Sequence, residues 1–179
     1  MLQWLKATNS NPAPRLQPGA QRNTAIAGTI AAAIALAVPV VAQYEGYSGK
    51  AYFDVAHVKT ICYGATAADG IDFGRTYTKA ECQQILGEKD LPKYAAMAQS
   101  CTKVPVPLHR AVAIISFTYN LGQGSYCHGI APYFNRGDVA GGCHAMLGYV
   151  NARVGGVLRP VAALVTRRKG EYALCVRSD

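Results

Sequence analysis

The chain has 179 residues, half of them hydrophobic, which suffices for one domain with a core, or for one domain and a leader. Its formal net charge of +8 favours an anionic partner, such as nucleic acid, anionic lipid or the acidic polymers of a cell wall. The six cysteines contain no CxxC pair, which argues against zinc-ribbon and thioredoxin classes, and no RNP, KH or zinc-finger pattern supports nucleic-acid binding.

An uncharged apolar segment occupies residues 24–42, and three basic residues but no acid precede it. At about 1.5 Å per residue it is long enough to span a bilayer, although eight alanines make it only weakly apolar. The basic flank predicts that residues 1–23 form a cytoplasmic tail and that the remainder is exported. We interpret residues 24–42 as a signal anchor. A cleavable signal peptide ending at Ala42 and a buried core helix are the alternatives.

Two carboxylic acids and a hydroxyl follow at a spacing of E-x8-D-x5-T, namely Glu45, Asp54 and Thr60. One protonated and one ionised carboxyl group are the minimum that cleavage of a glycosidic bond requires. An acid near a helix end and an acid on a following strand can face each other across a cleft. These three residues are therefore the candidate catalytic residues. His57 lies between two of them, and a surface turn position is the interpretation favoured over a role in tuning Asp54.

The pattern of residues 43–179 predicts one α+β domain. Short strands are predicted at 51–53 and 59–63, with a turn between them. A capping box, Thr78 with Glu81, opens the first of several helices. The expected helices are one after Thr78, one at 91–101, one at 108–121 that ends at Gly122, one capped by Asp138, and one at 161–176. The sum predicts a small β-sheet subdomain, a larger helical lobe and a cleft where they meet.

The last helix carries a basic cluster, Arg167, Arg168 and Lys169, which we expect on its outer side. A solvated helix face is the favoured interpretation, and contact with acidic wall polymers or lipid is the alternative.

The six cysteines follow an apparent export segment, which predicts disulfides formed in an oxidising compartment. Sequence alone cannot select among the possible pairings. A bond between Cys127 and Cys143 would close a short loop and is the favoured pair. Buried free thiols are the alternative. A disulfide at Cys62, two residues from Thr60, is interpreted as structural rather than as a gate for the site.

From Glu45 to about Arg177 the chain resembles the phage-type lysozymes of glycoside hydrolase family 24, and its leader resembles that of endolysins with a signal-anchor-release segment. The matching blocks are the E-x8-D-x5-T spacing, TICYG at 60–64, SFTYNLG at 116–122, RPVAALVTRR at 159–168 and EYALC at 171–175. One departure is the tryptophan that the family often carries near Tyr149, because the only tryptophan here is Trp4. Another is Ala65, where a polar residue commonly follows the glycine.

The resemblance implies a lysozyme-like fold and an endolysin: a muramidase that hydrolyses the β-1,4 bond between N-acetylmuramic acid and N-acetylglucosamine in peptidoglycan during host lysis. It implies an inverting reaction in which Glu45 is the general acid, Asp54 is the ionised partner that stabilises the transition state and activates water, and Thr60 positions that water. Tyr119 and Asn120 either face the cleft or hold two helices together. No cofactor, metal or nucleic acid is expected.

The implied partners are peptidoglycan and, through residues 24–42, the host inner membrane. The chain would be a monomer, held first in that membrane with its N-terminus inside and then released to the periplasm. Two other hypotheses stay open. A lytic transglycosylase would use one acid and no activated water. A cationic membrane- or nucleic-acid-binding protein would use no catalysis at all.

Overall fold

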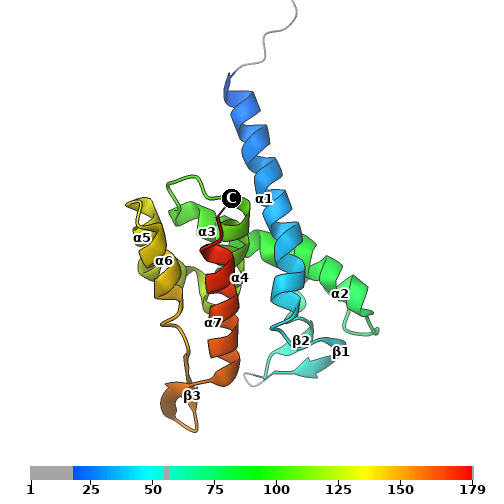
Figure 1. The fold of residues 1–179 in the computed structure, drawn as a ribbon. Helices are drawn as coiled ribbons and strands as arrows, with labels where there is room; N and C mark the ends of the chain where they lie inside the picture. The colour runs from blue at the N-terminus through cyan, green and yellow to red at the C-terminus, as the bar shows by residue number, and fades with distance from the viewer. Residues whose placement is uncertain (1–17, 55–56, 179) are drawn as a thin grey trace, which may run out of the picture.

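The computed structural model describes residues 18–54 and 57–178, so most of the expected cytoplasmic tail lies outside it. Small antiparallel strand pairs and a helical majority confirm the α+β class (Figure 1). The elements in chain order are α1 Pro18–Ala42, β1 Ser48–Phe53, β2 Lys59–Cys62, η1 Ala67–Asp69, α2 Lys79–Ile85, η2 Leu86–Asp90, α3 Leu91–Cys101, α4 Leu108–Gly129, α5 Ala131–Asn135, α6 Val139–Met146, β3 Asn151–Val154, β4 Val157–Pro160 and α7 Ala162–Cys175.

The β-sheet subdomain is the hairpin of β1 and β2, which pair antiparallel with Tyr52 opposite Thr60. Both strands lie close to the ranges that the sequence predicts. Their turn needs His57 at a positive φ of 58°, a backbone conformation that side-chain-bearing residues adopt rarely. This turn brings the end of β1 back onto the start of β2.

A helical rod, α2–η2–α3, connects this hairpin to the larger lobe. The predicted capping box is confirmed: the Thr78 side chain accepts from the Glu81 N–H, and Glu81 accepts from the Thr78 N–H. Midway, η2 is a π-helical turn in which the Leu91 N–H donates to the Leu86 carbonyl. Pro92 follows directly and has no N–H to donate, so the regular α-helical bonding is interrupted here.

The larger lobe is built on α4, and its helix starts follow the sequence signals. Asp138 caps α6 by accepting from the Gly141 N–H, as expected. The predicted end of a helix at Gly122 is confirmed, because Gly122 is non-helical with a φ of 77°, which glycine adopts without a steric penalty. A second helical stretch follows this kink, so α4 extends to Gly129.

The short helix α5, the hairpin of β3 and β4, and the 3-10 turn η1 have no counterpart in the sequence-based prediction. The hairpin turns through Gly155 and Gly156, both with positive φ, as a two-residue reversal requires. Almost all of its residues are exposed, so the alternation of buried and exposed positions that usually reveals a strand is missing.

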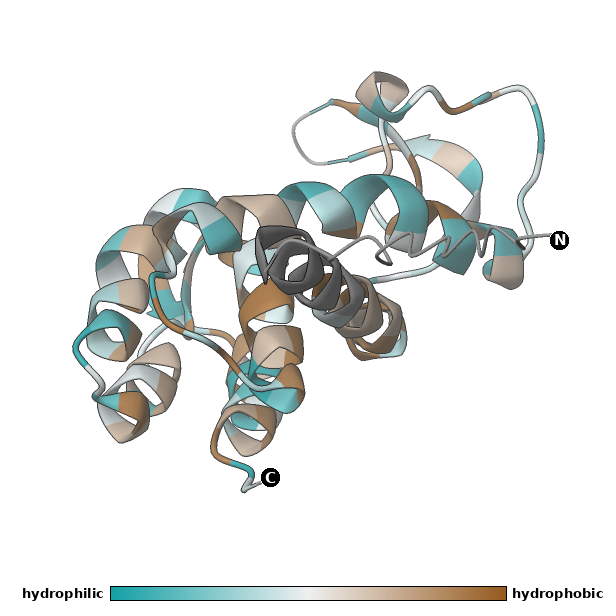
Figure 2. Cartoon of the chain, turned by 90° about the horizontal axis from the view of Figure 1, so that it is seen from above, coloured by the Kyte–Doolittle hydropathy of each residue, from teal (hydrophilic) through white to brown (hydrophobic). Residues whose placement is uncertain are grey.

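Helix α1 packs against α4 and α3 and projects beyond them at its N-terminal end (Figure 1). Small side chains on one face allow the approach, since Ala33, Ala37 and Val41 are at most 1% exposed. Within the part of the chain that the structure describes, no helix combines the length and apolarity that crossing a bilayer requires. In Figure 2 the helices carry both hydrophilic and hydrophobic residues, as expected where each helix buries one face.

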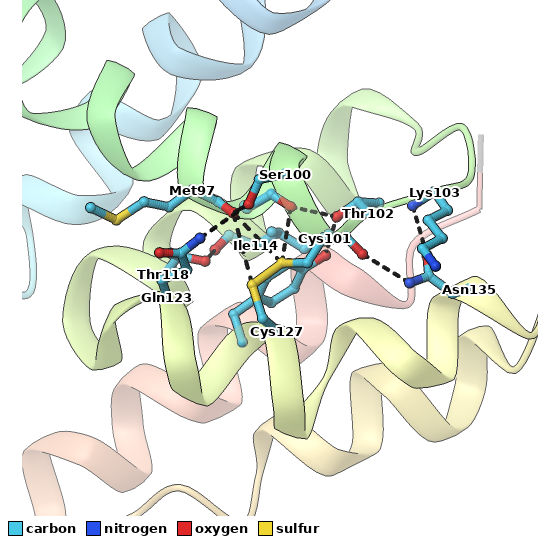
Figure 3. Close-up of a disulfide and its surroundings, with 12 residues drawn as sticks. Met97, Ser100, Cys101, Thr102, Lys103, Ile114, Thr118, Gln123, Cys127 and Asn135 are labelled. Atoms are coloured by element: carbon cyan, nitrogen blue, oxygen red, sulfur yellow. Dashed lines mark hydrogen bonds between the residues drawn. A yellow bond between two sulfur atoms is a disulfide. The ribbon is translucent and has the colours of Figure 1, made fainter.

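All six cysteines form disulfides, so the free-thiol alternative is wrong. The favoured pairing of Cys127 with Cys143 is also wrong. The three bonds are Cys62–Cys82, Cys101–Cys127 and Cys143–Cys175. Each ties two elements, namely β2 to α2, α3 to α4, and α6 to α7. Figure 3 shows the second bond between α3 and α4, near Asn135, which donates to the Cys101 carbonyl and accepts from the Lys103 N–H.

Candidate functional site

Glu45 lies on the turn that ends α1. The turn closes through the Val41 carbonyl, which accepts from the N–H groups of both Tyr44 and Glu45. The Glu45 side chain is 26% exposed, and its Oε1 accepts a hydrogen bond of 2.5 Å from Arg167 Nη1. The seating of α1 therefore determines where this carboxyl group lies relative to α7.

Arg167 and Arg168 are buried, not on the outer side of α7 as the sequence analysis expected, while Lys169 is exposed. Their burial is possible because the core supplies a carboxylate. Glu171, which is fully buried, accepts at Oε1 from Arg167 Nε and from Arg168 Nη2, both at 3.1 Å. The Ser116 hydroxyl donates to the same oxygen at 2.6 Å. Buried charges persist in proteins when they are paired in this way.

Burial and the neighbouring charges shift the pKa values of Arg168 and Glu171 in opposite directions. Burial lowers the pKa of Arg168 to about 10, which still leaves it protonated near neutral pH. Burial raises the pKa of the Glu171 carboxyl, against the effect of Arg168, of the Ser116 hydroxyl and of Arg167. The network therefore holds two guanidinium groups beside two carboxyl groups, Glu45 and Glu171.

Asp54 and Thr60 are both attached to one residue, Val58. The Val58 N–H donates to Asp54 Oδ1 at 2.8 Å, and the Val58 carbonyl accepts from the Asp54 N–H at 3.0 Å. The same carbonyl accepts from the Thr60 hydroxyl at 2.9 Å. Thr60 is buried and Asp54 is half-buried. The structure thus links these two candidates through Val58. The Thr60 hydroxyl donates its hydrogen bond to the Val58 carbonyl, so its oxygen can still accept a hydrogen bond from a water molecule.

Tyr119 and Asn120 both hold elements together, and Tyr119 also lines the cavity between the hairpin and the helices. The Tyr119 hydroxyl donates to the Tyr63 carbonyl at 2.6 Å and so attaches the end of the β hairpin to α4. Burial, assisted by the nearby Glu45, raises the pKa of Tyr119, so this phenol stays neutral. Asn120 Oδ1 accepts from Arg168 Nη2 at 3.0 Å and joins α4 to α7.

A cavity of about 160 Å³ lies where the hairpin meets the helices, beside Gly64, Tyr94 and Tyr119. Its polar wall is a cluster of Asp69, Asp90 and Lys93, in which the ammonium group contacts both carboxylates. A larger cavity of about 540 Å³ lies between α1 and the segment 102–106, away from all three candidate catalytic residues. In residues 18–54 and 57–178 no group of three or more His, Cys, Asp or Glu side chains could hold a metal ion.

Sequence reasoning missed Arg167 and Glu171 as parts of the site. The available signal was their i, i+4 spacing on one helix, within two of the blocks that carry the resemblance. That spacing predicts a neighbouring pair but not its burial. The contact with Glu45 joins residues 122 positions apart, which no local pattern can reveal.

Comparison with known proteins identifies the family to which this chain belongs. The profile of the family described as Phage lysozyme matches residues 42–171. A SAR-endolysin of Bacteriophage PS119 is 35% identical over 164 residues, covering 88% of this chain and 95% of the relative. A SAR-endolysin of Pseudomonas phage phiKMV is 31% identical over 145 residues, covering 81% of this chain and 89% of the relative.

Solved structures agree. An endolysin from Escherichia coli O157:H7 phage FAHEc1 superposes with a TM-score of 0.69 at 27% identity, over 78% of this chain and 90% of that one. The muramidase domain of SpmX from Asticaccaulis excentricus gives a TM-score of 0.72 at 22% identity, over 80% and 96% of the two chains, a likeness of fold. The lysozyme-like fold expected from the resemblance is thereby confirmed.

Proposed function

Because the chain belongs to the phage lysozyme family, we propose that it is an endolysin that hydrolyses the β-1,4 bond between N-acetylmuramic acid and N-acetylglucosamine in peptidoglycan. The observation that carries the proposal is the division of the candidate acids between two settings. Glu45 sits against a buried arginine network, whereas Asp54 lies in a hairpin turn beside the Thr60 hydroxyl. Two carboxyl groups in different surroundings are what acid and base roles at one glycosidic bond require.

In the proposed reaction Glu45 donates its proton to the leaving glycosidic oxygen. Asp54 acts as a carboxylate: its Oδ1 accepts from the Val58 N–H, and its charge stabilises the positive charge that develops on the sugar ring. A water molecule hydrogen-bonded to Thr60 and Asp54 attacks the anomeric carbon from the opposite face, its proton passes to the Asp54 carboxylate, and the glycosidic C–O bond breaks as Glu45 protonates the leaving oxygen. Configuration at that carbon is therefore inverted. The chain supplies every group that these steps need.

The first test replaces Glu45 by glutamine, which keeps the shape of the side chain and removes its exchangeable proton. Hydrolysis of purified peptidoglycan should fall at least about a hundredfold, the usual contribution of a general acid. Glu88→Gln is the matched control, since Glu88 is an exposed acid that accepts only from Gln84 in the described structure. Full activity in a folded Glu45→Gln protein would refute the mechanism.

Product analysis separates hydrolysis from the transglycosylase alternative. Mass spectrometry of digested peptidoglycan should find reducing-end muramic acid, because water is the nucleophile. A 1,6-anhydro sugar would instead mean that no water is activated, and that Asp54 and Thr60 are dispensable. Wall lysis that persists after Glu45→Ala and Asp54→Ala together would favour a cationic protein that disrupts membranes without catalysis.

We propose further that residues 24–42 anchor the exported chain in the host inner membrane, N-terminus inside, until it is released to the periplasm. The relatives named SAR-endolysin support this, as does the weakly apolar, alanine-rich composition of the segment. Released protein would use the same residues as α1 and act as a monomer on the wall. Cell fractionation with intact-mass measurement tests the anchor: a released chain that begins after Ala42 would show cleavage instead.

A further inference from the structure

Arg167 holds two carboxyl groups at once and is itself almost completely buried, with 3% of its side chain exposed. Nη1 donates to Glu45 and Nε donates to Glu171, while Nη2 donates to the Ser116 carbonyl at 3.0 Å. All three nitrogens are therefore engaged, and the guanidinium plane cannot turn without losing buried hydrogen bonds. Whatever fixes the Nε edge of Arg167 thus also aims its Nη1 edge at Glu45.

Glu171 fixes that edge, because donors from three residues converge on its carboxylate. Oε1 accepts from Ser116, Arg167 and Arg168. Oε2 lies 3.0 Å from Arg168 Nε, an ion-pair contact without the alignment of a hydrogen bond. Two of the three neighbours are guanidinium groups, which can only donate, and they favour the carboxylate against the burial that raises the pKa of Glu171.

The charges explain how Glu45 can work as an acid beside an arginine. The guanidinium of Arg167 contacts Glu45, and that of Arg168 shares Glu171 with Arg167. Without compensation these two positive charges would favour the Glu45 carboxylate, which has no proton to donate. Glu171 supplies one buried negative charge against those two positive ones. With Glu45 protonated, the cluster of Glu45, Arg167, Arg168 and Glu171 carries a net charge of +1, whereas without Glu171 it would carry +2.

We propose that Glu171 is a positioning residue for the reaction: it orients Arg167 toward Glu45 and offsets the guanidinium charge, so that Glu45 can take up the proton that it donates to the glycosidic oxygen. This inference rests on the proposed function, since it assigns Glu171 a part in the same site. Glu171 touches no substrate and acts through Arg167.

Two buried phenols near Glu45 do not titrate in the working range, whereas one more distant carboxyl group, Asp90, does. Tyr119 of α4 and Tyr94 of α3 both sense the Glu45 charge, and burial raises the pKa of each, so both are neutral there. Tyr44 places its ring 5.3 Å from the Arg167 guanidinium. Asp90 is a neighbour of the two tyrosines, with a pKa raised by burial to about 6. Its titration would be seen in every variant and cannot mimic an effect of Glu171.

The test is the pH profile of kcat/KM for hydrolysis of soluble peptidoglycan fragments. Its alkaline limb reports loss of the proton from the general acid. Glu171→Gln keeps an acceptor oxygen for Ser116 and Arg167 but removes the negative charge. The limb should therefore move to lower pH by about one unit, the effect expected when an arginine near a carboxyl group loses its counter-charge. Glu171→Asp, which keeps the charge, should restore the limb even where kcat stays reduced.

The opposite charge change gives a second, independent variant. Arg168→Gln removes one positive charge and should move the limb to higher pH, whether or not Glu171→Gln folds. Glu81→Gln is the matched control, because Glu81 also pairs with an arginine, Arg75, but at the exposed surface. The alkaline limb of this variant's pH profile should match that of the wild-type protein. Circular dichroism and thermal unfolding establish that each variant is folded.

Shifts of opposite sign for the two charge changes would support the inference, since structural damage alone cannot produce both. A folded Glu171→Gln or Arg168→Gln protein with lowered kcat and an unmoved limb would overturn it and leave the proposed function intact. A separate result, the absence of hydrolysis by the wild-type protein at every pH, would overturn the proposed function.

Discussion

Glu45 and Arg167 are 122 positions apart in the sequence and are joined by a 2.5 Å contact in the structure. Glu45 belongs to the turn that ends α1, and Arg167 belongs to the buried face of α7. The contact therefore couples the seating of α1 on the helical lobe to the chemistry at Glu45. A displacement of α1 would separate the candidate acid from the network that orients it.

This coupling predicts that overpacking α1 lowers activity as well as stability. Ala37 is fully buried, so Ala37→Leu should destabilise the fold by about 1–3 kcal/mol and reduce wall hydrolysis by shifting Glu45. Leu36→Ala is the control on the adjacent residue, which is 50% exposed, and it should leave both quantities close to wild type. Urea unfolding and a turbidity assay measure them. Equal stability of the two variants would contradict the packing of α1.

The Tyr119 hydroxyl should matter for holding the β hairpin. Tyr119→Phe leaves the Tyr63 carbonyl without its 2.6 Å donor, at a cost of about 1–2 kcal/mol, and loosens the subdomain that carries Asp54 and Thr60. We expect reduced kcat and faster amide exchange in β2. Tyr133→Phe is the control, because no hydroxyl hydrogen bond of Tyr133 occurs in the described structure. Unchanged exchange in Tyr119→Phe would show that the bond does not attach the hairpin.

The disulfides should differ in their effect on activity. Each closes a loop of 20 to 32 residues, so removing any one should cost about 3–4 kcal/mol. Replacing Cys62 and Cys82 by alanine frees β2, the strand of Thr60, and should lower hydrolysis at temperatures where the protein is still folded. The matched double replacement of Cys101 and Cys127 lies in the helical lobe and should lower Tm with little loss of activity below it. Equal activity losses for the two pairs would refute this distinction.

Asp90 predicts a pH dependence of stability. Burial, with a contribution from Asp69, raises the pKa of Asp90 from 3.8 to about 6 in the folded protein. The folded state therefore binds the proton more tightly than the unfolded chain. Stability from this group is fully present below pH 3.8 and is lost as the pH rises to about 6.

Asp90→Asn should accordingly stabilise the protein at pH 7 by about 1–2 kcal/mol, a value reduced for partial solvent screening, and should have little effect at pH 4. Urea unfolding of both proteins at the two pH values measures the difference, and the pH 4 comparison is the internal control. A larger gain at pH 4 than at pH 7 would show that the carboxylate is not destabilising.

Much of the local structure was predictable because its signals lie within a few residues. Thr78 and Glu81 cap each other three positions apart, and Asp138 caps α6 in the same way. The β3–β4 hairpin was not predictable, since its exposed strands show no alternation. The candidate catalytic residues were recognised from their spacing and from the family resemblance, and their roles stay predictions that the variants above test.

By itself, the sequence determined the helix caps, each from residues close together in the chain, and the α+β class and the family, each from the order of such local signals along the domain. Only the tertiary structure decided which cysteines pair, and whether Arg167 and Arg168 face water or the core. A run of basic residues is normally solvated, since burying a charge costs several kcal/mol unless a partner meets it. One partner, Glu171, lies on the same helix, but Ser116 of α4 and Glu45 after α1 come from other elements, and only folding brings them to the arginines and buries the cluster.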